Sequence, residues 1–171
     1  MSAVLHRNLR QTPQTVARGE GCYLIDTQGR RYLDASGGAA VACLGHGHPR
    51  VIAAIQRQVE TLAFAHTSFV TSAPAEALAE QLMAQVPAGF GRGRVSFVGS
   101  GSEAMEAGLK LARQHFVEAG QPQRSRFIAR RMSYHGNTLG ALAIGGHAGR
   151  RAIYEPILMK PALIAPCHAY R

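Results

Sequence analysis

The chain has no tryptophan and little lysine, and aromatic residues make up only 6% of its 171 residues. Lys110 and Lys160 are the only lysines, so the net charge of +9 is carried almost entirely by arginine. The arginines are scattered in short groups and do not form a basic stripe interleaved with aromatic residues. A nucleic-acid-binding surface usually combines clustered basic residues with stacking aromatic rings. We therefore expect no nucleic-acid partner.

Cysteine is also scarce. Cys22, Cys43 and Cys167 are odd in number and far apart, and the sequence contains no Cys-x-x-Cys pair. This pattern argues against a disulfide framework and a zinc site, and it favours free thiols in a reducing cytoplasm. No apolar run approaches the roughly 20 residues of a membrane span. The first residues also lack the apolar core of a secretory signal. We expect a cytoplasmic protein with no membrane partner.

The remaining composition is that of a globular protein, with 46% hydrophobic residues. From Val86 onward, helical and strand-like segments alternate, with strands expected over 94–98 and 126–129. Such alternation favours an α/β fold with a mostly parallel sheet. Only two or three sheet strands are visible in the sequence, so the chain resembles the front part of a larger protein.

The first part of the chain predicts a hairpin followed by a helix. Residues 21–34 contain two short apolar runs around an Asp26-x-x-Gly29 segment, which suits a β-turn. Residues 1–17 are polar and are expected to be irregular or a frayed helix, and residues 36–40 are expected to form a loop. Pro49 is placed to begin a helix with an apolar face, and a second helix is expected over 73–86.

The most informative segment is residues 98–104, a Gly-Ser-Gly-Ser turn between an expected strand and a long amphipathic helix that runs to about Phe116. The first N–H groups of a helix lack partners and, with the positive end of the helix dipole, favour an anion. Ser100 and Ser102 add hydroxyl groups, and Gly101 allows close approach of a ligand to the backbone. The segment therefore predicts a phosphate-binding turn.

Two other interpretations of this turn remain open. Ser102 could be the N-cap of an ordinary helix. The segment 99–104 also matches the G-x-G-x-x-G/A pattern of dinucleotide-binding proteins. That pattern expects an acidic residue after the next strand, whereas Arg130 and Arg131 stand there. Only an NADP-type Rossmann module would fit, and such a binding module without catalysis is the alternative hypothesis.

Tyr134, His135 and Gly136 follow the second expected strand of this region. In a parallel sheet they would lie at the same carboxyl edge as the Gly-Ser turn, where ligands of open α/β sheets bind. An aromatic ring beside a phosphate-binding turn suits a planar phosphorylated cofactor. We expect Tyr134 to stack on that cofactor.

His46 and His48 are the other pair of residues with ligand chemistry. A metal site would need further ligands, and the neighbouring sequence supplies no obvious carboxylate. We expect these histidines to order a turn, and we expect no metal site.

Four segments in the same order resemble the class III (omega-type) aminotransferases, which depend on pyridoxal 5′-phosphate. The resemblance implies a fold type I α/β structure, three-layered with a mostly parallel sheet and truncated here. The segments are the hairpin 21–34, the Leu-Gly-His-x-His-Pro turn 44–49, the Ser-Gly-Ser-Glu-Ala motif at 100–104 with its helix, and the Tyr-His-Gly element within 133–136.

The resemblance also implies roles for individual residues. Ser100, Gly101 and Ser102 would hold the cofactor phosphate, Tyr134 would stack on the ring, and His135 would support that site. Residues 1–66 would belong to the small domain and 67–171 to the first part of the large cofactor-binding domain. The family implies amino transfer from an amine or amino acid to a 2-oxo acid, in a homodimer. Three residues would lie near the dimer interface and the substrate: Phe64, His66 and Phe69. Phe64 and Phe69 could equally be buried core residues.

The sequence departs from the family in its catalytic residues. The family uses a Schiff-base lysine and an aspartate that pairs with the ring nitrogen, both well downstream of the Tyr-His-Gly element. Lys110 belongs to the helix motif, and Lys160 does not match the family's lysine context. Asp26 and Asp34, the only aspartates, belong to the hairpin. We expect an N-terminal fragment with no catalytic residue of its own that is inactive alone.

Overall fold

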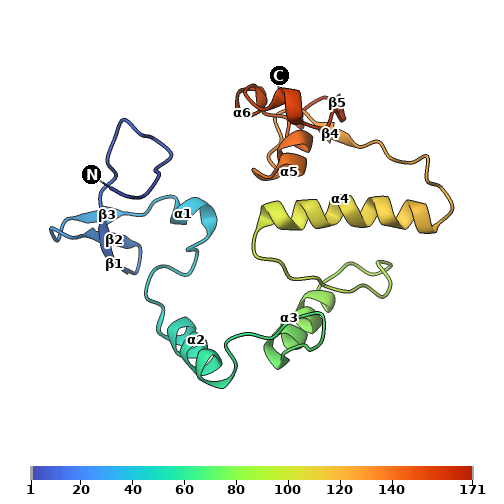
Figure 1. The fold of residues 1–171 in the computed structure, drawn as a ribbon. Coiled ribbons are helices and arrows are strands. Elements are labelled where there is room, and N and C mark those ends of the chain that lie inside the picture. Colours follow the sequence, from blue (N-terminus) through green and yellow to red (C-terminus); the bar gives the residue numbers. More distant parts are fainter. Residues whose placement is uncertain (1, 171) are drawn as a thin grey trace. The chain divides into compact units, whose positions relative to one another are not determined.

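The computed structural model describes residues 2–170. The chain divides into two compact units, Met1–Ala77 and Leu78–Arg171. Figure 1 shows the elements of each unit along the chain. No helix among the described residues combines the length and apolar character needed to cross a membrane.

The first unit contains a small antiparallel sheet of three strands in the order β1-β2-β3. The strands are β1 (Val16–Glu20), β2 (Tyr23–Asp26) and β3 (Arg31–Leu33). The predicted hairpin is confirmed, with Leu24 opposite Tyr32 and a turn closed by the Gly29 N–H, which donates to the Asp26 carbonyl at 3.0 Å. The expectation that residues up to 17 are irregular is wrong for β1, because its mostly exposed side chains give no apolar alternation.

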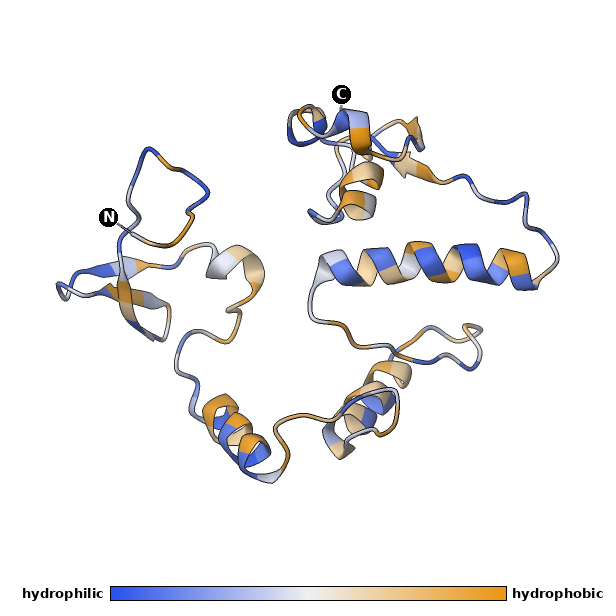
Figure 2. Cartoon of the chain, in the orientation of Figure 1, coloured by the Kyte–Doolittle hydropathy of each residue, from blue (hydrophilic) through white to orange (hydrophobic). Residues whose placement is uncertain are grey.

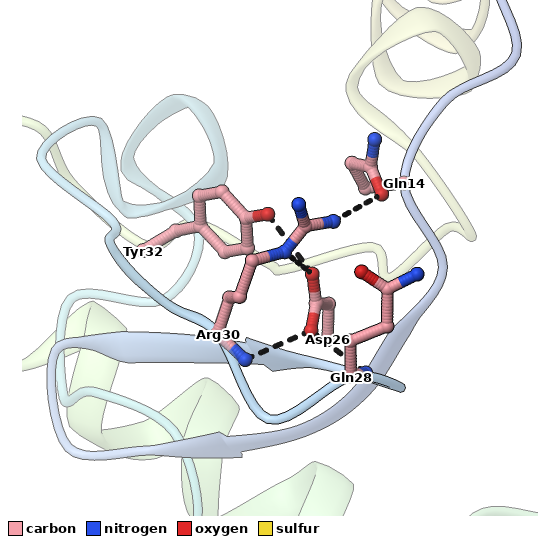
Figure 3. Close-up of polar contacts among 5 residues, drawn as sticks. All are labelled: Gln14, Asp26, Gln28, Arg30 and Tyr32. Carbon is pink, nitrogen blue, oxygen red and sulfur yellow. Dashed lines mark hydrogen bonds and ion pairs between the residues drawn. The ribbon is translucent and has the colours of Figure 1, made fainter.

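Asp26 is the polar centre of this sheet (Figure 3). The residue is only 3% exposed, and its carboxylate accepts hydrogen bonds from the N–H groups of Gln28 and Arg30, from Arg30 Nε at 2.7 Å and from the Tyr32 hydroxyl at 2.9 Å. Burial raises the pKa of this carboxyl, but the hydrogen bonds from Arg30, Tyr32 and Gln28 outweigh it and hold the pKa at about 2. Gln14 in turn accepts from Arg30 Nη2 at 3.0 Å, which fixes the guanidinium over the turn.

The rest of the first unit is a turn and a helix. The short segment α1 (Gly37–Ala40) replaces the predicted loop and is a left-handed turn, with positive φ at its glycines and at Ala39 and Ala40. Helix α2 (Pro49–Thr61) begins at Pro49 as predicted. Its apolar face, which includes Ile55 and Val59, is exposed in the described residues. Helix α3 (Ala73–Met83) follows and contains the boundary between the two units.

The second unit is built around α4 (Gly101–Glu118) and a parallel pair of strands, β4 (Ile128–Arg130) and β5 (Ala162–Ile164). Between the strands lie α5 (Leu139–Ile144), α6 (Ala148–Arg151) and the 3₁₀ turn η1 (Glu155–Ile157). Figure 2 shows polar and apolar residues alternating around α4. The parallel pairing agrees with the predicted α/β class. The buried apolar residues of this unit lie on β4, on α5 and after η1: Ala129, Ala141, Ala143, Ile144 and Leu158.

One predicted strand is absent from the described residues. The segment 94–98 carries no strand and takes part in none of the backbone hydrogen bonds found outside the regular elements. Phe97 and Val98 are 47% and 44% exposed. The prediction rested on β-branched and aromatic composition, but a strand also requires a neighbouring strand to pair with. No other described segment pairs with these residues, so the prediction of a strand there is wrong.

Candidate functional site

The N-terminus of α4 is closed by a reciprocal pair of hydrogen bonds. Ser100 is the N-cap, and its hydroxyl accepts from the Glu103 N–H at 3.2 Å. The Glu103 carboxylate reaches back and accepts from the Gly99 N–H at 2.6 Å. This arrangement resembles a capping box, in which the carboxylate accepts from the N–H of the N-cap residue. Here the carboxylate accepts from the residue before the N-cap. The interpretation of Ser102 as the N-cap is therefore wrong, because Ser100 fills that position and leaves the Ser102 hydroxyl for another partner.

Two N–H groups remain beside this cap. Within the described part of the chain, the N–H groups of Gly101 and Ser102 donate to no protein acceptor. They lie at the positive end of an 18-residue helix, where an anion is favoured. A Cβ added at Gly101 would meet no atom within 4 Å, and this glycine does not have a positive φ. Neither packing nor backbone conformation therefore requires glycine here, and the open space suits the close approach of a ligand.

The turn that follows β4 contacts this helix N-terminus. The Asn137 N–H donates to Ser102 Oγ at 3.1 Å, and Ser102 Oγ donates to Asn137 Oδ1 at 3.1 Å. Gly136 has φ +133°, and a Cβ there would collide with Ser102. Glycine is thus needed at 136 for both its conformation and the closeness of the two backbones. The structure brings together the Gly-Ser turn and the Tyr-His-Gly element, which are about 35 residues apart in the sequence.

Tyr134 lies at the accessible end of this turn. The residue is 65% exposed, and the Arg150 guanidinium lies over its ring at 4.8 Å from the centroid. The ring borders an open hollow of about 410 Å³ that Asn137, Arg150 and Tyr154 also line. His135 is half-buried beside it. An exposed aromatic ring on the turn that contacts the N-terminus of α4 suits the binding of a flat phosphorylated molecule.

Helix α5, which follows the turn, is fixed at both ends by charged side chains. The Glu106 carboxylate of α4 accepts from the N–H groups of Gly140 at 2.8 Å and Ala141 at 3.3 Å. The Thr138 hydroxyl beside it, and then these two N–H groups, lower the pKa of the Glu106 carboxyl against the opposing effect of burial. This contact is not visible in the sequence, because Glu106 resembles any polar residue of an amphipathic helix.

The opposite end of α5 is held by Arg151, which is 6% exposed. Its Nη1 donates to the carbonyl oxygens of Ala143 at 3.0 Å and Gly145 at 3.1 Å. Glu155 accepts from the same guanidinium, with both nitrogen–oxygen distances at 3.3 Å. The neighbouring Arg150 instead points to Tyr134, so two consecutive arginines have different tasks. Neither task is visible in the sequence, since the arginines occur in scattered short groups.

The predicted substrate residues Phe64, His66 and Phe69 lie in the first unit. Their rings are adjacent, with centroids 6.3 Å apart for Phe64 and His66 and 5.2 Å apart for His66 and Phe69. Phe64 is 75% exposed and Phe69 is 85% exposed, so neither is a core residue of this chain. His66 Nδ1 accepts from the Ser68 N–H at 3.3 Å, which orders the turn that carries the three rings.

His46 is paired within the first unit as well. Its Nε2 lies 2.9 Å from Asp34 Oδ2, and the His46 hydrogen bond lowers the pKa of the Asp34 carboxyl. His46 also forms a backbone bridge with Gly21, which ties the turn to the hairpin. The turn-ordering prediction is confirmed for His46. The expectation that no carboxylate stands near it holds for the neighbouring sequence but not for the folded chain. Asp34 lies 12 positions before His46 in the sequence, and the hairpin brings its side chain close to the histidine. Residues 2–170 contain no group of three potential metal ligands.

The chain matches the family described as "Aminotransferase class-III" over residues 4–167. It is 44% identical over 160 residues to an uncharacterized aminotransferase of Schizosaccharomyces pombe, covering 93% of this chain and 34% of that protein. It is 39% identical over 155 residues to the acetylornithine aminotransferase of Mycobacterium tuberculosis, covering 91% of this chain and 36% of that protein. The chain spans about a third of the length of these curated relatives.

A solved structure gives the same result for the fold. An omega transaminase from Pseudomonas jessenii in complex with PMP superimposes with a TM-score of 0.90 at 31% identity, covering 100% of this chain and 38% of that chain. The predicted fold type I architecture is therefore confirmed. The matches favour the aminotransferase hypothesis over a dinucleotide-binding module, and they include every segment on which the resemblance was based.

Proposed function

Because the chain belongs to the class III aminotransferases, we propose that it forms the cofactor-phosphate and ring-stacking part of a pyridoxal 5′-phosphate-dependent transaminase. The whole enzyme would transfer an amino group from an amine or amino acid to a 2-oxo acid. The pair of hydrogen bonds between Ser102 and Asn137 carries this proposal. It holds the aromatic turn against the free N–H donors of α4, as a phosphorylated aromatic ligand requires.

Each residue of the site would have a distinct task. The N–H groups of Gly101 and Ser102 would bind phosphate oxygens, and Ser100 would act indirectly by holding the helix N-terminus in place through Glu103. Tyr134 would stack on the cofactor ring while Arg150 covers its other face. His135 would support the turn. When bound, the cofactor would supply the electron-withdrawing ring on which amino transfer depends.

The catalytic lysine and the aspartate for the ring nitrogen find no counterpart here. Lys110 lies in the middle of α4, and Lys160 precedes β5. Asp26 and Asp34 are engaged by Arg30 and His46 in the first unit. We propose that the chain alone does not catalyse transamination. Residues 1–66 and 67–171 would belong to the small and large domains of the whole enzyme. The whole enzyme would be a cytoplasmic homodimer. Phe64, His66 and Phe69 would contact substrate near its interface.

Binding of pyridoxamine 5′-phosphate to the 171-residue chain tests the cofactor role, because this probe has the phosphate and the ring but no aldehyde that reacts with lysines. We expect saturable binding that Gly101→Val weakens at least tenfold by filling the open space above the N–H donors. Gly108→Val is the matched control on the same helix, since a Cβ at Gly108 also meets nothing within 4 Å.

Two outcomes would contradict the proposal. Equal binding by both glycine variants would show that the phosphate does not lie at the N-terminus of α4. Binding of NADP⁺ without binding of pyridoxamine 5′-phosphate would support the dinucleotide alternative.

A separate assay tests the inactivity of the chain alone. Incubation of the chain with pyridoxal 5′-phosphate, an amine donor and pyruvate should give no product above the cofactor-only background.

A further inference from the structure

The Ser102 hydroxyl both donates a hydrogen bond to Asn137 and accepts one from it. A serine hydroxyl has one proton to donate and two lone pairs that accept. Ser102 Oγ gives its proton to Asn137 Oδ1 and accepts the N–H of the same residue, both at 3.1 Å. The hydroxyl proton therefore points at the Asn137 amide oxygen and is not free for a ligand.

A phosphate at the N-terminus of α4 would compete for that proton. Phosphate oxygens accept hydrogen bonds, so the free N–H groups of Gly101 and Ser102 can donate to them without losing another partner. The Ser102 hydroxyl can donate to phosphate only if it leaves Asn137 Oδ1. The Asn137 N–H need not move in this exchange, because it uses a lone pair of the Ser102 oxygen and not its proton.

We propose that Asn137 is a positioning residue for the phosphate site, and that its side-chain oxygen competes with phosphate for the Ser102 proton. The inference rests on the proposed cofactor role of the site. On binding, the hydrogen bond from Ser102 Oγ to Asn137 Oδ1 breaks and one from Ser102 Oγ to a phosphate oxygen forms, so the number of bonds is conserved. Asn137 thus limits phosphate affinity while its backbone keeps the Tyr134 turn in place.

Gly136 makes the exchange possible. Its conformation and its closeness to Ser102 bring the Asn137 N–H within reach of Ser102 Oγ without a side chain between them. The backbone contact therefore survives replacement of the Asn137 side chain. This separates the two roles of the residue, and substitution at position 137 tests the side-chain role alone.

The test uses the 171-residue chain, with inorganic phosphate and pyridoxamine 5′-phosphate as probes. Dissociation constants come from the NMR shifts of the Gly101 and Ser102 amides, and circular dichroism checks that each variant is folded. We expect Asn137→Ala to bind both probes about three- to tenfold more tightly, since one hydroxyl donor is released. We expect Asn137→Asp to bind them about tenfold more weakly, because a carboxylate keeps the proton and repels phosphate.

The controls distinguish this mechanism from a general effect on folding. In a Ser102→Ala background, Asn137→Ala should leave the affinity unchanged, because the hydroxyl it would release is absent. Gln114→Ala removes an amide bonded to Glu118 on the same helix and should have no effect in either background. A folding defect would weaken binding in both Asn137 variants, whereas the proposal requires effects of opposite sign.

The outcomes separate this inference from the proposed function. Binding by the parent chain with no gain in Asn137→Ala, or with the same gain in the Ser102→Ala background, overturns the role of Asn137 and leaves the cofactor site standing. Absence of shifts at Gly101 and Ser102 in every variant at saturating probe overturns both.

Discussion

The Glu106 carboxylate lies 2.8 Å from the Gly140 N–H and connects the second turn of α4 to the first turn of α5. The two residues are 34 positions apart. Together with the contact between Ser102 and Asn137, this bond fixes the C-terminal side of the turn that carries Tyr134. The position of this turn is therefore determined by α4, the same helix that would hold the phosphate.

Removal of the Glu106 carboxylate should destabilise the second unit. We expect Glu106→Ala to lower the free energy of unfolding by about 1 to 3 kcal/mol, because the N–H groups of Gly140 and Ala141 lose their acceptor. Urea denaturation followed by circular dichroism measures the change. The matched control is Glu118→Ala, at the exposed end of the same helix, for which we expect a change within about 0.5 kcal/mol. Equal losses in the two variants would contradict the capping role of Glu106.

Asp26 should make the first unit sensitive to acid. Its folded pKa of about 2 lies below the ordinary value of 3.8, so the unfolded chain binds the proton more readily. The stability from this carboxylate is complete above about 3.8 and is lost as the pH falls toward 2. Thermal unfolding midpoints measured across this range should fall less steeply in Asp26→Asn, which cannot be protonated, than in the parent chain. Glu60→Gln serves as the control, and a parallel decrease in all three proteins would contradict the prediction.

The sequence predicted the elements that depend on local signals. The turn from Asp26 to Gly29, the helix start at Pro49 and the Gly-Ser start of α4 each follow from the conformational preferences of two or three adjacent residues. The expected strand at 94–98 failed because composition alone cannot supply a pairing partner. Strand β1 was not predicted, because its residues lack apolar alternation. It forms nevertheless, because β2 supplies a pairing partner.

The candidate site was predictable only in part. Its residue types and their order along the chain were visible in the motifs. The contacts that hold the site join residues 34 or 35 positions apart, such as Ser102 with Asn137, and no periodicity connects them. The different tasks of Arg150 and Arg151 are likewise hidden, because a one-residue step along a short helix turns two identical side chains in different directions.

These adjacent arginines should differ in their effect on stability. Arg151→Met leaves the carbonyl oxygens of Ala143 and Gly145 without a buried donor, and we expect a loss of about 1 to 3 kcal/mol. Arg150→Met removes only the contact over the exposed Tyr134 ring, which is expected to contribute about 0.5 to 1 kcal/mol. Urea denaturation of the two variants measures the difference. A larger loss of stability for Arg150→Met than for Arg151→Met would contradict the prediction that the buried Arg151 guanidinium contributes more to stability.

Tyr134 should affect only ligands that carry a ring. We expect Tyr134→Ala to weaken pyridoxamine 5′-phosphate binding about five- to tenfold, as loss of an aromatic stacking partner implies, and to leave inorganic phosphate binding unchanged. Tyr134→Phe keeps the ring and should retain the affinity for both probes. Tyr154→Ala, on the same hollow, controls for a general change of its lining. Titration of each variant with both probes gives the ratio of dissociation constants. An equal loss for the two probes would mean that Tyr134 shapes the phosphate turn and does not stack on the cofactor.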